Sequence, residues 1–329
     1  MMMLKDAQVL ITGATGFLGG ALARHLLRDG VKVRVIARTP EKATALRDLG
    51  AQVVQADLTD PASLRAAVQG CGVVFHVAVD YTSYAKQLRV NVDGTRYLAQ
   101  ASAEAGVTRF VHVSTLAVYN NLMRGDVYED YPLASSAYPY ALSKVEGERA
   151  LQDVSALYRL DYTIIRPGMI YGEGSLTWTD LLFNTARRTP TFWLNDGNGS
   201  AHLIHVDDVV DLMVTCALHP AAVNQIFNCA PDPAPTWRAV LSAYAHLDGK
   251  QAQIMSLSAL MRAAAGMAML AAPPISMGRD LPDLLDLISS QTTYKMDKAR
   301  RLLGWSPRVT LPDGIHRCAP YLRAKGLLR

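Results

Sequence analysis

The stretch that decides the fold is QVLITGATGFLGG, residues 8–20. Its first five residues are an apolar, β-branched run that predicts a buried strand, and a helical pattern begins at residue 17. Gly13, Gly16 and Gly19 follow that strand at GxxGxxG spacing. Such glycines permit a tight turn and a close approach of backbone to a pyrophosphate, whose charge is met by the helix N-terminus. The stretch therefore predicts a dinucleotide site, and a turn that needs glycine only for packing is the alternative.

The same alternation of strand and helix continues through the first half of the chain. We expect strands over 8–12, 32–37, 52–56, 73–78, 109–114 and 162–166, and helices over 17–29, 40–49, 61–69, 84–105 and 137–158. Short apolar strands that alternate with helices are typical of a parallel sheet covered on both faces. The predicted fold class is α/β, with a doubly wound parallel sheet of the Rossmann type.

The pattern becomes irregular after Pro167. A strand in HLIHV (202–206), a helix over 207–219 and a strand over 225–230 follow, and the chain is mainly helical in pattern from residue 231. We expect residues 1–168 to form the dinucleotide-binding domain, with 203–230 returning to it. Residues 169–202 and 231–329 then form a smaller, mostly helical region that binds the substrate.

Composition limits the classes of partner. The 329 residues carry a formal net charge of +4, and the basic residues form no run, so we expect no nucleic acid partner. The four cysteines lie far apart without a CxxC motif, which argues against a disulfide framework or a structural zinc site. No leader pattern precedes the first strand, so we expect no signal peptide and a cytoplasmic protein.

The most lipophilic stretch, residues 263–275, is too short to span a bilayer and is interrupted by Pro273 and Pro274. We expect no integral membrane span. A core or interface helix is the favoured interpretation of this stretch, and peripheral membrane contact is the alternative.

The end of the second predicted strand indicates which dinucleotide is bound. NAD-binding folds usually place an acidic residue there to bind the ribose 2′-hydroxyl. This chain has Ala37 followed by Arg38. An arginine suits a 2′-phosphate, and the missing carboxylate removes repulsion against it. The sequence therefore favours NADP, with NAD possible and a solvated surface arginine as the alternative.

Several motifs occur in an order that resembles the extended short-chain dehydrogenase/reductases. This group contains nucleotide-sugar epimerases and dehydratases, and the similarity is greatest to its dihydroflavonol reductase and 3β-hydroxysteroid dehydrogenase branches. The motifs are TGATGFLG (12–19), ADLTD (56–60), FHVAV (75–79), NVDGT (91–95), VSTLAVY (113–119), YALSK (140–144), RPGMIYG (166–172), IHVDDVV (204–210) and KARRLLGWSP (298–307).

The resemblance implies a set of site residues and a homodimer. It places Gly13, Thr15, Gly16, Phe17 and Leu18 at the cofactor phosphates, Asp57, Leu58 and Ala78 at the adenosine, and Pro167 and Met169 at the nicotinamide. It also implies a catalytic set of Thr115, Tyr140 and Lys144, in which Lys144 holds the nicotinamide ribose. Asn91 is expected to brace the active-site helix rather than to do chemistry.

Three tyrosines stand four residues before a lysine, in YALSK, YKMDK (294–298) and YLRAK (321–325). Only Tyr140 falls between the fifth and sixth predicted strands, where a helix can bring it beside a nicotinamide. A free phenol has a pKa of about 10, and a nearby ammonium with the positive nicotinamide favours the phenolate. We therefore expect Tyr140 to be the acid/base and the other two tyrosines to be structural or solvated.

The hydroxyl partner of Tyr140 has two candidates. The family pattern selects Thr115, and Ser114 is the alternative. Alternation along a strand predicts that these neighbours face opposite ways, so that only one of them reaches the site.

The favoured function is hydride transfer between nicotinamide and a carbonyl or secondary alcohol of a fairly apolar small molecule. A nucleotide-sugar epimerase or dehydratase is the alternative, and a non-catalytic NADP-binding regulator is less consistent with the catalytic set. Relatives that bind nucleotide sugars often have an arginine where Ala201 stands in NDGNGSAHLIHVDD (195–208). In a nucleotide-sugar enzyme, Arg187 or Arg188 would have to supply the positive charge that the missing arginine gives to the diphosphate.

The remaining histidines and aspartates are interpreted as structural residues. We expect no metal site at His202, His205, Asp207 and Asp208, because a strand turns the two histidines to opposite sides and either aspartate suits a helix N-cap. His76 and His112 lie in buried-strand patterns and are expected in the core. For Trp178, Phe192 and Trp193, a substrate cleft and a domain junction remain equally open.

Overall fold

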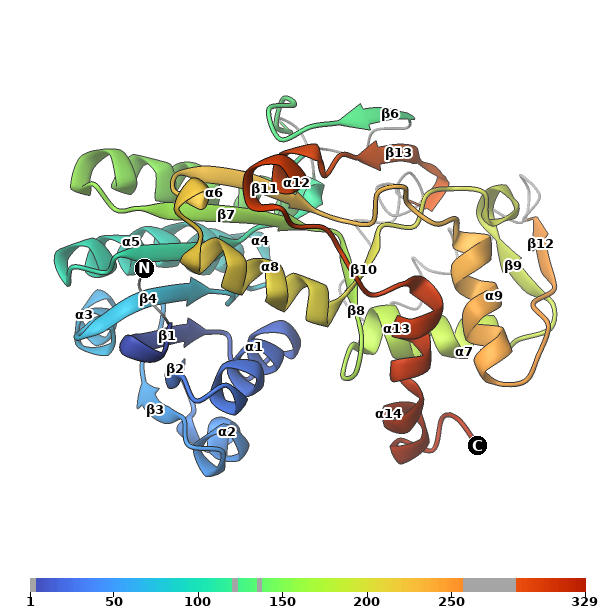
Figure 1. Cartoon of the computed structure of the whole chain (residues 1–329), viewed down its shortest axis with the longest axis horizontal. Coiled ribbons are helices and arrows are strands. Elements are labelled where there is room, and N and C mark those ends of the chain that lie inside the picture. The colour runs from blue at the N-terminus through green and yellow to red at the C-terminus, as the bar shows by residue number, and fades with distance from the viewer. Residues whose placement is uncertain (1–3, 120–123, 135–137, 257–287) are drawn as a thin grey trace.

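A computed structural model describes residues 4–119, 124–134, 138–256 and 288–329. Its centre is a seven-stranded sheet with the order β11-β7-β5-β4-β1-β2-β3, in which every neighbouring pair is parallel (Figure 1). The strands are β1 (Gln8–Thr12), β2 (Lys32–Ala37), β3 (Gln52–Gln55), β4 (Cys71–His76), β5 (Arg109–Val113), β7 (Tyr162–Pro167) and β11 (Gln225–Cys229). The predicted doubly wound fold class is confirmed.

Helices cover both faces of this sheet and enclose two separate hydrophobic cores. On one face α1 (Phe17–Arg28) packs beside α8 (Val206–Leu218), and on the other α3 (Pro61–Val68), α5 (Gly94–Glu104) and α6 (Pro139–Tyr158) form a layer. The short α2 (Thr44–Asp48) lies between β2 and β3 in the chain. Strands buried on both faces explain why their sequences are continuous apolar runs.

The long helix expected over 84–105 is divided into three parts. These are α4 (Tyr84–Gln87), a wide π-helical turn over Leu88–Asp93 and α5. Inside the wide turn Asn91 bonds the backbone of Asp80 and the hydroxyl of Ser143. Wide turns of this kind are frequent at functional sites, and the side-chain bonds of Asn91 give it a specific cause here.

A second region lies beyond the carboxyl ends of the sheet strands. Figure 1 shows α7 (Leu182–Ala186), α9 (Trp237–Leu247), α13 (Leu311–Arg317) and α14 (Ala319–Ala324) grouped there. They share a core that includes Trp237 and Tyr244. Three short parallel pairs complete the region: β8 (Met169–Tyr171) with β10 (Leu203–His205), β9 (Thr191–Trp193) with β12 (Ile254–Ser256), and β6 (Arg124–Val127) with β13 (Gln291–Tyr294).

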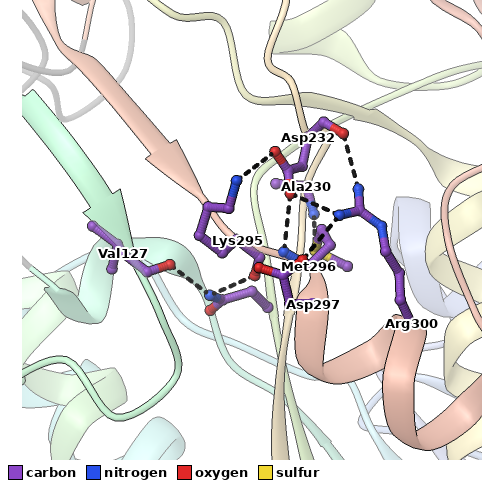
Figure 2. A network of polar contacts seen from close by, with 8 residues as sticks. Val127, Ala230, Asp232, Lys295, Met296, Asp297 and Arg300 are labelled. Carbon is purple, nitrogen blue, oxygen red and sulfur yellow. Dashed lines mark hydrogen bonds and ion pairs between the residues drawn. The ribbon is translucent and has the colours of Figure 1, made fainter.

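Asp232 joins this second region to the sheet. It follows β11, and its carboxylate accepts hydrogen bonds from the Lys295 ammonium at 3.3 Å, the Met296 N–H at 3.3 Å and the Arg300 guanidinium at 3.1 Å (Figure 2). The Lys295 N–H also donates to the Val127 carbonyl at 2.9 Å. One buried carboxylate thereby fixes the start of α12 (Asp297–Leu303) against the end of β11.

Within the described residues, we find no helix with the length and apolarity needed to cross a membrane. The apolar stretch 263–275 lies outside the described residues.

Candidate active site

A single cavity of about 970 Å³ extends from the β1–α1 turn into the second region. Every residue that the sequence predicts for the cofactor or for catalysis lines it: Gly13, Thr15, Gly16, Phe17, Leu18, Arg38, Asp57, Leu58, Ala78, Thr115, Tyr140, Lys144, Pro167 and Met169. The parallel strands β1, β2, β4, β5 and β7 end at this edge of the sheet, which is where such folds bind their ligands. The fold thus brings the predicted residues together, and their individual roles remain predictions.

The β1–α1 turn has the shape of a pyrophosphate cradle. Gly13 has a φ of 70°, and a Cβ at this position would lie 2.7 Å from the backbone nitrogen of Ala78. The twelve-residue helix α1 has Gly16 at its N-cap with no side-chain capping bond. Its first N–H groups therefore receive no side-chain cap from Gly16, and the helix dipole favours an anion there. This turn fits a dinucleotide phosphate.

Arg38 lines the part of the cavity where the resemblance predicts the adenosine. It follows the last residue of β2, and its side chain is exposed, whereas Ala37 is buried. The neighbouring carboxylate, Asp57, uses Oδ1 to accept bonds from the Thr59 N–H and hydroxyl, both at 2.8 Å. The arrangement at the end of β2 is compatible with a ribose 2′-phosphate.

Tyr140 is in the first turn of α6 and forms side-chain hydrogen bonds with Thr115 and Tyr81. The ring of Tyr81 lies over it, with the two ring centroids 4.8 Å apart. Burial raises the pKa of Tyr140 well above its ordinary value, the phenols of Tyr81 and Tyr138 add to this, and the Thr115 hydrogen bond opposes it. We expected the Lys144 ammonium and the nicotinamide to lower the pKa of Tyr140. The protein without its cofactor instead raises that pKa.

Lys144 explains part of that difference. It is fully buried, and its ammonium donates to the Val113 carbonyl at 2.8 Å and lies 3.4 Å from His112 Nε2. Burial lowers the pKa of Lys144 to about 8. The ammonium is thus held at the end of β5, and the main influences on the pKa of Tyr140 come from burial and from Tyr81, Tyr138 and Thr115.

Ser114 and Thr115 both line the cavity. The expectation that only one of them reaches the site is wrong, because β5 ends at Val113 and strand alternation does not extend to these residues. Thr115 is the residue that bonds Tyr140, whereas the buried Ser114 hydroxyl has no partner among the described residues.

Helix α6 is fixed to the sheet by a buried ion pair that sequence reasoning missed. Glu148, one turn after Lys144, accepts two bonds from Arg166 of β7, at 2.6 and 3.0 Å. Arg166 also donates to the Tyr119 hydroxyl at 2.7 Å. Burial opposes the charge of Arg166, but bonding to Glu148 raises its pKa above the ordinary value. The spacing of Tyr140, Lys144 and Glu148 along one helix face was the available signal.

A chain of buried hydrogen bonds links the end of β1 to α6. Thr12 bonds His76 at 2.8 Å, His76 bonds Thr95 at 2.9 Å, and Thr95 donates to the Asn91 carbonyl at 2.7 Å. Asn91 Nδ2 then donates to Ser143 at 3.0 Å, and the Ser143 hydroxyl donates to the Tyr140 carbonyl at 2.8 Å. Asn91 therefore braces the helix as expected.

The two other Tyr–Lys spacings have no acid/base geometry. Tyr294 ends β13 whereas Lys298 is in α12, so they share no helix, although Tyr294 does line the cavity. Tyr321 and Lys325 both donate to Asp180, at 3.1 and 2.7 Å, and join the end of α14 to the segment Leu176–Leu181.

The histidines and aspartates at the start of α8 have structural roles. No metal-binding group of histidine, cysteine or carboxylate side chains occurs in the part of the chain that the structure describes. The predicted aspartate N-cap of α8 is wrong, because His205 caps the helix, Asp207 pairs with Arg317, and Asp208 accepts the backbone N–H groups of Arg308 and Val309.

Of the three aromatic residues left open, Trp178 lines the cavity, Trp193 packs on Trp237, and Phe192 is exposed on β9. Both histidines expected in the core, His76 and His112, are buried. Burial lowers the pKa of His76 to about 3, and the charge of Lys144 acts in the same direction.

This fold and site define a dinucleotide-dependent enzyme class, and comparison with known proteins identifies it. The model of the NAD dependent epimerase/dehydratase family matches residues 9–230, and the chain belongs to that family. The predicted family is thereby confirmed.

Individual relatives cover nearly the whole chain. The chain is 32% identical to a ceramide reductase of Caulobacter vibrioides, over 99% of this chain and 98% of that protein. It is 30% identical to a UDP-glucose 4-epimerase of Mycolicibacterium smegmatis, over 97% of this chain and 99% of that one. The solved structure of MoeE5 in complex with UDP-glucuronic acid and NAD is similar with a TM-score of 0.76 and 26% identity, over 97% of this chain and 99% of that one.

Proposed function

We propose that the protein is an NADP-dependent oxidoreductase that transfers hydride between nicotinamide and a carbonyl or secondary alcohol of an apolar small molecule. The observation that carries this proposal is the character of the cavity beyond Pro167. Its lining there is uncharged: Gly168, Met169, Ile170, Gly174, Ser175, Leu176, Thr177, Trp178, His202 and Tyr294. A pocket of this kind gains binding energy from apolar surface and specificity from a few polar groups.

The proposed chemistry assigns one task to each side chain. Bound NADP supplies or accepts the hydride. Tyr140 gives its proton to the carbonyl oxygen in reduction and takes it back in oxidation. Thr115, already bonded to Tyr140, aligns the same oxygen. Lys144 holds a ribose hydroxyl from the end of β5, and Glu148 keeps the helix that carries both residues against Arg166.

The groups that would hold a nucleotide-sugar diphosphate favour this proposal over its alternative. Ala201 is fully buried in the core of the second region. Arg187 donates to the Leu327 carbonyl at 2.6 Å and pairs with Asp248, and neither it nor the exposed Arg188 lines the cavity. Among the described residues, Arg38 and Lys144 are the basic side chains of the cavity wall.

An epimerase or dehydratase acting on a nucleotide sugar is the second candidate. It is supported by the similarity to the UDP-glucose 4-epimerase and to MoeE5. In that case the cofactor would be reduced and reoxidised within one turnover, and NAD would be the expected form.

We also propose that the chain is divided into the two regions predicted from its sequence. Residues 1–168 with 203–230 would bind the cofactor, and residues 169–202 and 231–329 would form the substrate side. We infer a small-molecule substrate and a homodimer from the family.

Cofactor oxidation by the purified protein tests the proposal. NADPH and NADH are supplied in parallel with long-chain ketones, aldehydes and UDP-glucose, for the native chain and for Arg38→Ala. The proposal expects NADPH oxidation with a ketone, and a loss of about 10- to 100-fold in NADPH affinity in Arg38→Ala with NADH binding unchanged. Turnover of UDP-glucose without net cofactor change would instead establish the second candidate.

A further inference from the structure

His202 has unused hydrogen-bonding capacity in the wall of the cavity. Its side chain is 1% exposed, and neither ring nitrogen has a partner among the residues that the structure describes. Buried polar groups in native proteins are almost always bonded, so an imidazole with two free nitrogens requires an explanation. Because the residue lines the cavity, a ligand bound there is a candidate partner for the ring.

The position of His202 is fixed by its neighbours. Its carbonyl accepts the Met169 N–H at 2.9 Å, next to the segment predicted to flank the nicotinamide. A Cβ at Gly168 would collide with the same carbonyl, so the two backbones require glycine to approach this closely. The ring packs edge-to-face on Tyr294, with the centroids 4.7 Å apart and an interplanar angle of 79°. These contacts hold the imidazole in the wall between Met169 and Tyr294.

The charge state of His202 limits the chemistry of its partner. Burial lowers its pKa to about 4, so the ring is neutral at physiological pH. A neutral imidazole offers one N–H donor and one acceptor nitrogen. An anionic group would satisfy only the donor. The two ring nitrogens point in different directions, so one hydroxyl or one secondary amide bonds one of them, either as an acceptor for the N–H or as a donor to the bare nitrogen.

We propose that His202 is a specificity-determining residue that hydrogen-bonds a second polar group of the substrate. The selected substrates are apolar carbonyl compounds, or the matching alcohols, that carry a hydroxyl or secondary amide besides the reacting oxygen. This inference rests on the proposed function and makes its substrate class narrower. The reacting oxygen is held by Tyr140 and Thr115, and His202 holds the second group.

The test uses three ketones of similar length with NADPH at pH 7. N-hexyl-3-oxobutanamide has a secondary amide, N-hexyl-N-methyl-3-oxobutanamide lacks its donor, and 2-undecanone has no second polar group. Each is assayed with the native chain, His202→Leu and His202→Gln, which keeps a donor and an acceptor. His246→Leu, at an exposed position of α9, is the matched control.

We expect the preference for the secondary amide over 2-undecanone, as a ratio of kcat/KM, to fall about 10- to 100-fold in His202→Leu. The loss should appear mainly in KM, should be partly restored in His202→Gln and should be absent in His246→Leu. Equal losses for all three ketones, or no loss, would overturn the inference and leave the proposed function standing.

Binding separates the failure of this inference from the failure of the proposed function. The alcohol N-hexyl-3-hydroxybutanamide is titrated by calorimetry into the native chain and into His202→Leu with NADP present. Binding that depends on His202 without turnover of any ketone would contradict the proposed function alone. Neither turnover nor His202-dependent binding would overturn both.

Discussion

The two ends of the cavity differ in how their buried histidines, His76 and His202, are bonded. At the proposed cofactor end, Thr12, His76, Thr95 and Asn91 form a continuous chain of hydrogen bonds, and Glu148 and Arg166 neutralise one another. At the other end His202 has no partner for either nitrogen among the described residues. In our proposal the first region holds one invariant cofactor and bonds most of its polar groups internally, with the Ser114 hydroxyl as an exception. A region built for a particular substrate keeps bonding capacity for that substrate.

Among the changes predicted here, removal of the Tyr140 hydroxyl is expected to have the largest effect on activity. In Tyr140→Phe the proposed proton donor is lost, and we expect kcat to fall by about 10²- to 10⁴-fold. NADPH affinity should stay within a factor of about three, because the cofactor is held mainly by other groups. Stopped-flow turnover and fluorescence titration measure the two quantities. Retained activity would show that Tyr140 is not the proton donor, and the proposed mechanism would then be wrong.

The Glu148–Arg166 pair tests whether the cofactor end depends on internal neutralisation. Glu148→Gln leaves the Arg166 charge buried with no carboxylate, and we expect the free energy of unfolding to drop by about 3–5 kcal/mol. Glu146→Gln is the control on the same helix, because its partner Arg149 is exposed, and it should cost about 1 kcal/mol or less. Urea denaturation of both variants gives the comparison. Equal effects would show that the buried pair is unnecessary for the stability of α6.

The success of sequence reasoning follows the same division. Gly13 and Arg38 directly follow short strands, and Thr115 is the second residue after β5; these strands are visible as local patterns, so the positions of the three residues at one sheet edge were predictable. The chain was expected to be mainly helical from residue 231, yet Tyr294 ends the strand β13, which pairs in register with Arg124–Val127 far away in the chain. Its partner strand has only four residues and no local signal. Contacts of this kind depend on tertiary packing, and the local pattern does not contain them.

Acid destabilisation tests the substrate end. The pKa of His202 is lowered to about 4 in the folded chain by burial, against about 6.5 in the unfolded chain. Below pH 6.5 the unfolded chain binds the extra proton, so stability falls as pH drops from 6.5 towards 4 and this contribution levels off below pH 4. His202 alone accounts for up to about 3 kcal/mol by this linkage.

His202→Gln removes this titration, so the difference in unfolding free energy between pH 7 and pH 4 should be smaller than in the native chain. The lowered pKa values of His76 and His112, also buried, leave a residual slope in both proteins. Urea denaturation at several pH values measures the slopes. Identical slopes would mean that His202 is protonated or solvated in the folded chain, which would weaken the contrast between the two ends.

Tyr81 is expected to produce the smallest effect and lies where the two ends meet. Its phenol stacks on Tyr140 and helps to raise the pKa of that residue, whereas Thr115 acts in the opposite direction. Tyr81→Phe removes the hydrogen bond, so the pKa of Tyr140 should fall. Alcohol oxidation requires Tyr140 as a base, and its rate should therefore begin to rise at a lower pH in the variant. Tyr84→Phe, on the exposed α4, is the matched control and should keep the native profile. If the pH profile of Tyr81→Phe equals that of the control, then Tyr81 only lines the cavity and does not influence the pKa of Tyr140.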